Sequence, residues 1–120
     1  MRRFYRLETE AGILVADHVD VADDLLSRAR GLMFRPGLAP GHGLALRPCS
    51  SVHMFFMRFP LDVVFVDGEG RVVRILAGIR PWRASGIVRG AKAAIELPVG
   101  TAARAGVTAG TVVRMIEAGV

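Results

Sequence analysis

Short runs of apolar residues, separated by glycine, proline and charged turn residues, make up most of this chain. Runs of this length between turn residues are typical of β-strands. Two pairs of runs are joined by short polar turns, Glu10-Ala11 and Asp67-Gly68-Glu69-Gly70, so each pair is expected to form a hairpin. The pattern predicts strands at residues 4–9, 12–18, 43–47, 52–57, 61–66, 71–77, 93–97 and 111–117.

Residues 21–30 have helical spacing instead. Asp20 is in the position of an N-cap, Gly31 follows as a stop, and one face of the helix would carry Val21, Leu25, Leu26 and Ala29. A second, shorter helical turn is expected at residues 101–105, capped by Thr101. Because the strands follow one another directly, the order argues against alternating βαβ units. We predict a mostly β chain, an antiparallel β-sandwich or partly closed barrel with the helix packed against it, in one domain over residues 1–120.

The most apolar stretch, residues 52–67, contains His53, Arg58, Asp62 and Asp67. A buried charge is costly unless it is paired, so each is expected at the surface, in a pair or in a functional site. Asp62 begins a strand that is apolar on both faces, which predicts a central strand.

Two interpretations of Asp62 follow. The carboxylate either has a structural role, anchoring a turn or pairing with Arg30, Arg35 or Arg58, or it lies in a cleft as a base or cation ligand. His53 is expected to share a strand face with Phe55 and Met57, as a hydrogen-bonded core or rim residue. On a neighbouring strand it would instead complete an acid–base pair with Asp62.

Cys49 lies four residues before His53, which places the two roughly 13 Å apart along an extended strand. A shared metal or nucleophile site would therefore need a turn between them. We interpret Cys49 as a partly buried structural thiol, with a nucleophile as the alternative, and expect no metal site. Glu96, the only charge in its strand, is expected to be exposed or, if covered, to pair with Arg80 or Arg83.

The longest irregular stretch, residues 78–91, contains Arg80-Pro81-Trp82-Arg83. Long loops on rigid β scaffolds often bind ligands, and a tryptophan beside arginines can stack on a sugar ring or a base, or recognise an anion. The alternative is that Trp82 closes the open end of the sandwich. The candidate ligand-binding residues are Arg35, His53, Asp62, Arg80, Trp82 and Arg83.

Sixteen basic and eleven acidic residues give a net charge of +5, which is modest for a nucleic-acid-binding protein. Neither RNA-binding aromatic motifs nor a basic recognition helix occurs, so we expect no nucleic-acid partner. No apolar run approaches the roughly 20 residues of a membrane span, and none follows the basic N-terminus as in a signal peptide. We therefore expect a cytoplasmic protein without membrane association, and a single cysteine excludes a disulfide within the chain.

Four blocks of sequence carry a family resemblance: residues 30–35, 53–67, 81–83 and 95–100, followed by a turn at Gly110. Together they resemble the domain-of-unknown-function family 192, a group of small bacterial and archaeal proteins. The resemblance implies a mostly β single-domain fold and brings no established activity, substrate or cofactor. This chain departs from the family pattern at Thr111, where the family usually has Asp, and it shows no secretion or lipoprotein signal of the kind many relatives carry.

Three functional hypotheses follow from these residues. The first is a domain that binds a small polar or anionic ligand, with no cofactor, in a cleft lined by the candidate residues. The second is an acid–base enzyme, such as a hydrolase, that uses Asp62 and His53. The third is a structural or interaction module whose polar residues are internal braces. The expected oligomeric state is a monomer or weak homodimer.

Overall fold

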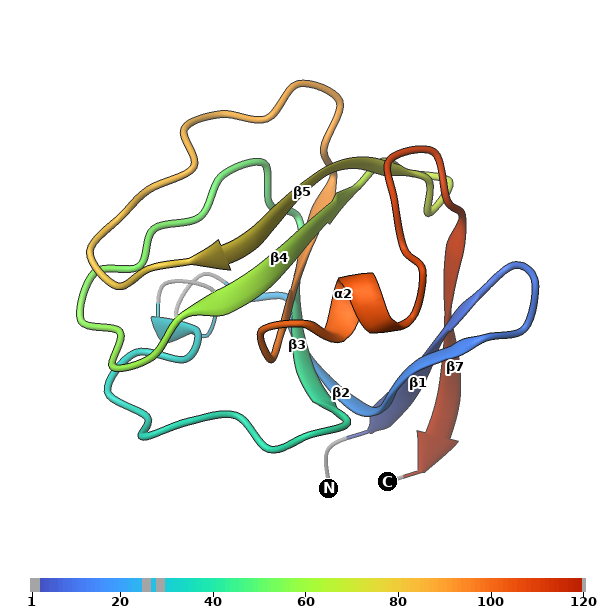
Figure 1. The fold of residues 1–120 in the computed structure, drawn as a ribbon, viewed down its shortest axis with the longest axis horizontal. Coiled ribbons are helices and arrows are strands. Elements are labelled where there is room, and N and C mark those ends of the chain that lie inside the picture. The colour runs from blue at the N-terminus through green and yellow to red at the C-terminus, as the bar shows by residue number, and fades with distance from the viewer. Residues whose placement is uncertain (1–2, 25–26, 28–29, 120) are drawn as a thin grey trace.

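The computed structural model describes residues 3–24, 27 and 30–119, and most of them belong to strands or to long loops (Figure 1). The elements are β1 (Phe4–Thr9), β2 (Leu14–Ala22), β3 (His42–Leu46), β4 (Leu61–Val66), β5 (Val72–Ile79), β6 (Ala93–Leu97), α2 (Thr101–Arg104) and β7 (Val113–Gly119). The predicted strands at residues 4–9, 61–66 and 93–97 are confirmed at their predicted bounds.

The seven strands form one sheet in the order β5-β4-β6-β3-β2-β1-β7. All neighbours are antiparallel except β2 and β3, which run parallel because residues 23–41 are long enough to carry the chain back across the sheet. The edge strands β5 and β7 begin side by side at the isolated bridge between Arg71 and Val112, and the sheet is not closed into a barrel. The mostly β prediction is confirmed, whereas a sandwich of two sheets is not.

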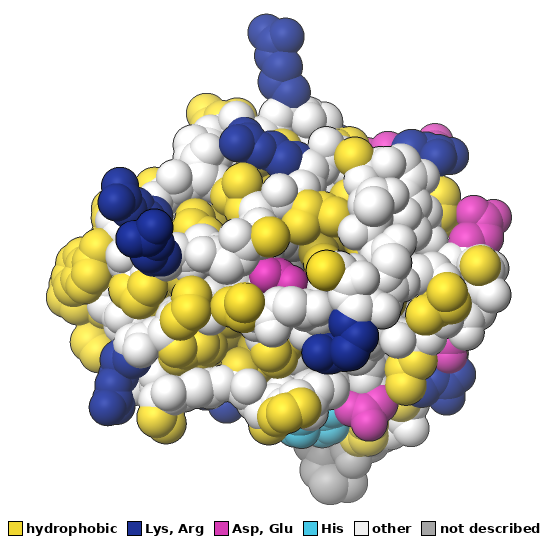
Figure 2. All heavy atoms as spheres, in the orientation of Figure 1, with side chains coloured by type: hydrophobic (Ala, Val, Ile, Leu, Met, Phe, Trp, Pro, Cys, Tyr) yellow, Lys and Arg dark blue, Asp and Glu magenta, His cyan; other side chains and the backbone are white. Residues whose placement is uncertain are grey.

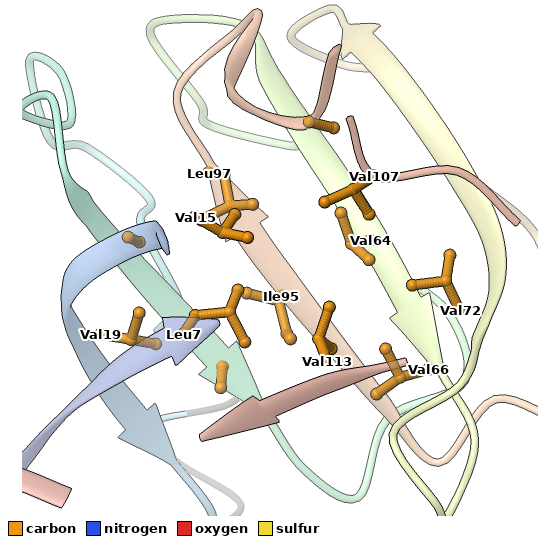
Figure 3. Packing of buried hydrophobic residues seen from close by; sticks show 13 residues of the cluster. Leu7, Val15, Val19, Val64, Val66, Val72, Ile95, Leu97, Val107 and Val113 are labelled. Carbon is orange, nitrogen blue, oxygen red and sulfur yellow. The ribbon is translucent and has the colours of Figure 1, made fainter. Parts of the chain in front are cut away.

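Each face of the curved sheet carries its own apolar core. Side chains of the first core point into the concave side, where α2 also lies (Figures 1 and 3). The second core lies on the other face, beneath the loops that contain Leu32, Met54 and Val88. β4 contributes to both, since Val64 and Val66 belong to the first core and Leu61, Val63 and Phe65 to the second. The predicted central strand is confirmed, because β4 pairs with β5 on one side and β6 on the other and is buried throughout.

The predicted helix begins too early. Asp20 and Val21 belong to β2, which continues to Ala22 because these residues pair with β3. Asp24 Oδ1 accepts a hydrogen bond from the backbone N–H of Ser27 at 2.8 Å, a contact of the kind that N-cap side chains make. Leu25, Leu26 and Ala29, which were expected on the apolar face, lie outside the described residues.

The predicted strand at residues 52–57 is wrong, because this segment is a loop with a single bridge between His53 and Ala84. It runs beside residues 82–85, and the two loops exchange backbone hydrogen bonds that a sheet neighbour would otherwise make. Met54 N–H donates to the carbonyl of Arg83 at 2.7 Å, and Trp82 N–H donates to that of Met54 at 2.7 Å. The apolar residues of the loop at 52–57 therefore differ in exposure: Met54 and Met57 are buried, whereas Phe55 is exposed.

Two turns near the C-terminus contain a threonine for which the sequence raised a role. The predicted turn at residues 101–105 corresponds to α2, but its N-cap is Gly100 and Thr101 makes no cap hydrogen bond. Thr111, which stands where the family pattern has Asp, accepts a hydrogen bond from Thr108 N–H through its Oγ1 at 3.1 Å. The hydroxyl thus closes this turn as a carboxylate would.

Candidate functional site

An exposed cluster of aromatic side chains occupies the loops at one end of the molecule. The rings are 43% to 61% exposed, and neighbouring centroids lie 5.0 to 6.0 Å apart. We call this group the aromatic cluster; it consists of Phe34, Phe55, Phe56 and Trp82. Its members come from three loops far apart in sequence, so the cluster exists only in the folded chain.

Three members of the cluster have left-handed backbone conformations. Phe34, Phe56 and Trp82 have φ angles of 67°, 63° and 70°, and no other non-glycine residue in the described ranges has a positive φ. Such a conformation costs a bulky residue about 1–2 kcal/mol. Backbone hydrogen bonds between the loops hold it in place, among them the bond from Phe34 N–H to the carbonyl of Phe56 at 3.0 Å. The backbone is therefore strained at three positions whose aromatic rings are exposed to water.

Positive charge surrounds the aromatic cluster. Residues 31–61 contain three arginines, residues 70–95 contain five arginines and one lysine, and neither range contains Asp or Glu. The exposed arginines in or beside the cluster's loops form no ion pair with another described residue; they are Arg35, Arg58, Arg80 and Arg83. Figure 2 shows hydrophobic and basic side chains at the edge where these loops lie, and no acidic side chain at that edge. This end of the molecule is suited to attract anions.

A small cavity of about 60 Å³ opens beside the aromatic cluster. Its wall combines apolar groups with a few polar side chains; it is lined by Arg30, Gly31, Leu32, Met33, Leu46, Cys49, Ser51, Val52, His53, Met57 and Glu96. His53 connects the cavity to the aromatic cluster, because it lines the cavity and its ring stacks on Phe55 with centroids 4.8 Å apart. We call this space the Glu96 cavity.

Glu96 is an ionisable residue that is more buried than the sequence led us to expect. It was expected to be exposed, but it is 5% exposed, because the face of β6 that carries it is covered by the second core. Neither Arg80 nor Arg83 forms an ion pair with it among the described residues, and its Oε1 is buried without any hydrogen-bond partner. Burial alone raises the pKa of Glu96 from 4.5 to about 7. A carboxyl with these properties gains and loses its proton near neutral pH.

Cys49 and His53 both line the Glu96 cavity, yet each already has a local partner. The thiol of Cys49 donates to the carbonyl of Ser51 at 3.0 Å, and the Nδ1 of His53 accepts from Phe55 N–H at 3.3 Å. Contrary to the prediction, His53 lies in a loop and is exposed. Over residues 3–24, 27 and 30–119, no group of three His, Cys, Asp or Glu side chains is arranged to hold a metal ion.

The structure does not bring Asp62 and His53 together. Asp62 is 1% exposed and lies on the concave face of β4, whereas His53 borders a cavity on the other face. Both carboxylate oxygens of Asp62 accept backbone N–H groups: Oδ1 from Gly78 at 3.0 Å, and Oδ2 from Gly100 and Ala102 at 3.0 and 3.1 Å. These bonds join β4 to the end of β5 and to the start of α2. The contacts of Asp62 are those of a structural anchor.

The remaining candidate residues are divided among three places. Trp82 is linked to His53 through Phe55, so these two predicted residues belong to one surface. Arg83 lines a hollow of about 320 Å³ beside β5, and Arg35 lines another of about 650 Å³ together with Asp20 and Asp24. Sequence reasoning missed Glu96 as a buried group, and it missed Phe34 and Phe56. The two stretches without acidic residues, 31–61 and 70–95, are the signal in the sequence that could have pointed to this end of the molecule.

Comparison with known proteins places this chain among proteins without an assigned activity. The sequence model of the domain-of-unknown-function family 192 (DUF192), described as "Uncharacterized ACR", matches residues 6–115. The UPF0127 protein of Pyrococcus abyssi is 40% identical over 88 residues, which cover 68% of this chain and 72% of that protein. The UPF0127 protein of Thermococcus sibiricus is 42% identical over 86 residues, which cover 68% of this chain and 55% of that protein, so the match spans about half of that relative's length.

Two solved structures share the fold. A protein of unknown function from Novosphingobium aromaticivorans superimposes with a TM-score of 0.76 at 26% identity, covering 92% of this chain and 83% of that one. A putative transcription regulator from Sinorhizobium meliloti gives a TM-score of 0.76 at 28% identity, covering 96% and 94% of the two chains. No helix in the described part of the present chain is long and apolar enough to cross a membrane.

Proposed function

Because this chain belongs to the domain-of-unknown-function family 192, whose description names no activity, we propose its function from the geometry of the candidate site. We propose that the protein is a binding domain for a small anion with a ring-shaped apolar face. The ring of the ligand stacks on the aromatic cluster, and its negative charge is bound by the surrounding arginines.

The left-handed backbone at three exposed aromatic residues is the observation that carries this proposal. Folding alone gains little from a phenylalanine in water, and a left-handed conformation at such a residue destabilises the folded chain. Phe34, Phe56 and Trp82 combine both costs at one surface. A ligand that covers the rings accounts for an arrangement that protein stability does not favour.

Charge complementarity selects an anion as the ligand. Arg35, Arg58, Arg80 and Arg83 are exposed and have no acidic partner among the described residues, so a carboxylate or phosphate meets no competing internal ion pair. Arginine also binds carboxylates through two parallel hydrogen bonds and stacks on rings.

The size of the aromatic surface favours a small ligand over a protein partner. An aromatic side chain has about 150–250 Å² of surface, so four rings that are roughly half exposed offer about 400 Å². A stable protein interface covers about 800 Å² on each partner. The cluster is therefore large enough for one or two rings and small for an interface.

Trp82 makes the proposal directly testable, because it is the only tryptophan of the chain and its fluorescence reports on the aromatic cluster alone. We expect cyclohexanecarboxylate to change Trp82 emission with a saturable, salt-sensitive titration curve, and the uncharged cyclohexanemethanol to bind at least tenfold more weakly. Phe56→Ala should weaken binding at least tenfold. Ile87→Ala, which removes an 81% exposed side chain outside the cluster, is the matched control and should change nothing.

Three other results would overturn the proposal. No saturable response to either compound would remove the binding site. Concentration-dependent dimers that Phe56→Ala abolishes would show that a second copy covers the cluster. Flotation with vesicles of phosphatidylserine, without a response to soluble anions, would assign the cluster to a membrane surface.

A further inference from the structure

Beside the aromatic cluster, the Glu96 cavity is lined by a carboxyl group that has a buried oxygen to which none of the described residues donates. We infer that this cavity receives a hydroxyl group of the ligand, so that the ligand of the proposed function is an acidic sugar. The inference rests on the proposed function and narrows it, because it names the class of compound that the aromatic cluster would bind.

The unpartnered Oε1 of Glu96 is the first reason. Nearly all buried polar atoms in proteins have a hydrogen-bond partner. An atom without one indicates that a ligand or a water molecule supplies it. This oxygen is fully buried, and none of the described residues donates to it. Because Glu96 lines the cavity, a donor that enters the cavity can approach its carboxyl group, whose other oxygen, Oε2, is not fully buried among the described residues.

The cavity volume limits what can enter. A protein cavity that binds benzene measures about 150 Å³, and the Glu96 cavity, at about 60 Å³, is less than half of that. A hydroxyl or hydroxymethyl group fits, whereas a six-membered ring does not. The ring of the ligand must therefore stay outside, on the aromatic cluster.

The charges around the cavity select an uncharged donor. The ionisable groups that line it are Arg30, Cys49, His53 and Glu96 itself. A carboxylate or phosphate would be repelled by the carboxyl of Glu96 whenever that carboxyl is ionised, and it would keep the carboxyl from ionising. An ammonium group would have to pass Arg30 and the arginines around the aromatic cluster. A hydroxyl group carries no charge, donates to Glu96 and tolerates the apolar side chains of the wall.

The Glu96 cavity and the aromatic cluster adjoin each other and form one site. His53 lines the cavity and stacks on Phe55, and Met33 of the cavity wall directly precedes Phe34. A sugar acid has the matching groups: an apolar C–H face for the aromatic rings, a carboxylate for the arginines and a hydroxyl for Glu96.

The test compares glucuronate with cyclohexanecarboxylate, since both contain a six-membered ring with a carboxylate and only glucuronate has hydroxyl groups. We expect the wild-type protein to bind glucuronate at least tenfold more tightly, measured by Trp82 fluorescence. Glu96→Leu should abolish this preference and leave cyclohexanecarboxylate binding unchanged. Glu96→Gln, which keeps the shape of the side chain, serves if the leucine variant does not fold.

Proton release provides a second measurement that a purely structural role of Glu96 would not affect. A hydroxyl that donates to the carboxylate favours its ionised form, so glucuronate binding near pH 7 should release protons in calorimetry with buffers of different ionisation enthalpy. Glu96→Gln should abolish that release, while protons linked to His53 or Cys49 would remain.

The outcomes separate this inference from the proposed function. Equal affinity for both compounds, or a preference for glucuronate that survives in Glu96→Leu, would overturn the inference and leave the proposed function standing. Absence of binding by both compounds would overturn the two together.

Discussion

The buried carboxyl of Glu96 should make the stability of this protein depend on pH in an unusual direction. Its pKa is about 7 in the folded protein and 4.5 in its ordinary state. Between these two values the folded chain keeps a proton that the unfolded chain has released. The contribution of Glu96 to the free energy of unfolding is therefore fully present below about pH 4.5. It declines as the pH rises and is lost once the folded carboxyl has also ionised, above about pH 7. Most structural carboxylates have the opposite effect, because their pKa values are lowered by folding.

The size of the effect follows from the difference in pKa. One pKa unit corresponds to 1.36 kcal/mol, so the 2.5 units between 4.5 and about 7 amount to about 3 kcal/mol. Since Glu96 is almost fully buried, solvent screens little of this energy. For a domain whose total stability is about 5–15 kcal/mol, the loss is easily measured.

Glu96→Gln isolates this contribution, because glutamine has nearly the same shape and does not ionise. Urea denaturation of both proteins from about pH 4 to about pH 8.5 should give a difference in the free energy of unfolding that shifts by about 3 kcal/mol in favour of the variant. Groups whose titration the substitution does not change cancel in this difference. A difference that stays constant over the whole range would refute the reasoning, since it would mean that the carboxyl is solvated in the folded protein.

Three further predictions concern the scaffold, each measured as the free energy of unfolding in urea. Asp62→Ala leaves three backbone N–H groups without their acceptor and should destabilise the fold by about 3–5 kcal/mol; a loss below about 1 kcal/mol would show that water replaces the carboxylate. Thr101→Val removes a buried hydroxyl that has no hydrogen-bond partner among the described residues, so stability should be unchanged or rise by up to about 1 kcal/mol, and a clear loss would reveal a partner for the hydroxyl. Gly70→Ala places a Cβ in steric conflict with the carbonyl oxygen of Val113 at a φ of +81°, and it should cost about 2–4 kcal/mol. Gly110→Ala, at a φ of +95° with open space around the new Cβ, should cost about 1 kcal/mol, and equal losses would contradict the steric explanation.

Local sequence was sufficient where neighbouring residues alone decide the structure. The strands β1, β4 and β6 were predicted at their observed bounds, because each is a continuous apolar or alternating run between turn residues. The hairpin between β4 and β5 was confirmed as well, since Asp67 Oδ1 accepts the N–H groups of Glu69 and Arg71 within the turn itself.

Local sequence failed where distant segments compete for the same residues. Residues 52–57 have the composition of a strand, but their hydrogen bonds go to the loop at residues 82–85 instead of a sheet neighbour. Val21 has helical spacing, yet pairing with Ala45 of β3 keeps it in β2. In both cases the partner lies more than twenty residues away and is invisible to a local pattern.

The candidate site was predicted only in part for the same reason. His53 and Trp82 were singled out by residue type, and the fold does place both beside Phe55. For Asp62 the sequence left two interpretations, a structural anchor and a functional carboxylate in a cleft, because an acid at the start of an apolar strand fits both; its hydrogen bonds are those of the anchor. Which face of β6 is covered cannot be deduced from its five residues, so the burial of Glu96 was missed.

The amino-acid sequence by itself determined the β character of the chain, the position of its most buried strand and the concentration of positive charge in two stretches without acidic residues. Composition and short-range spacing determine all three. Only the tertiary structure decided that the three aromatic loops meet, that Asp62 binds backbone amides and that Glu96 is buried without a partner. These properties depend on which side chains and backbone groups come together across the sheet, and contacts between residues so far apart in sequence form only when the whole chain folds.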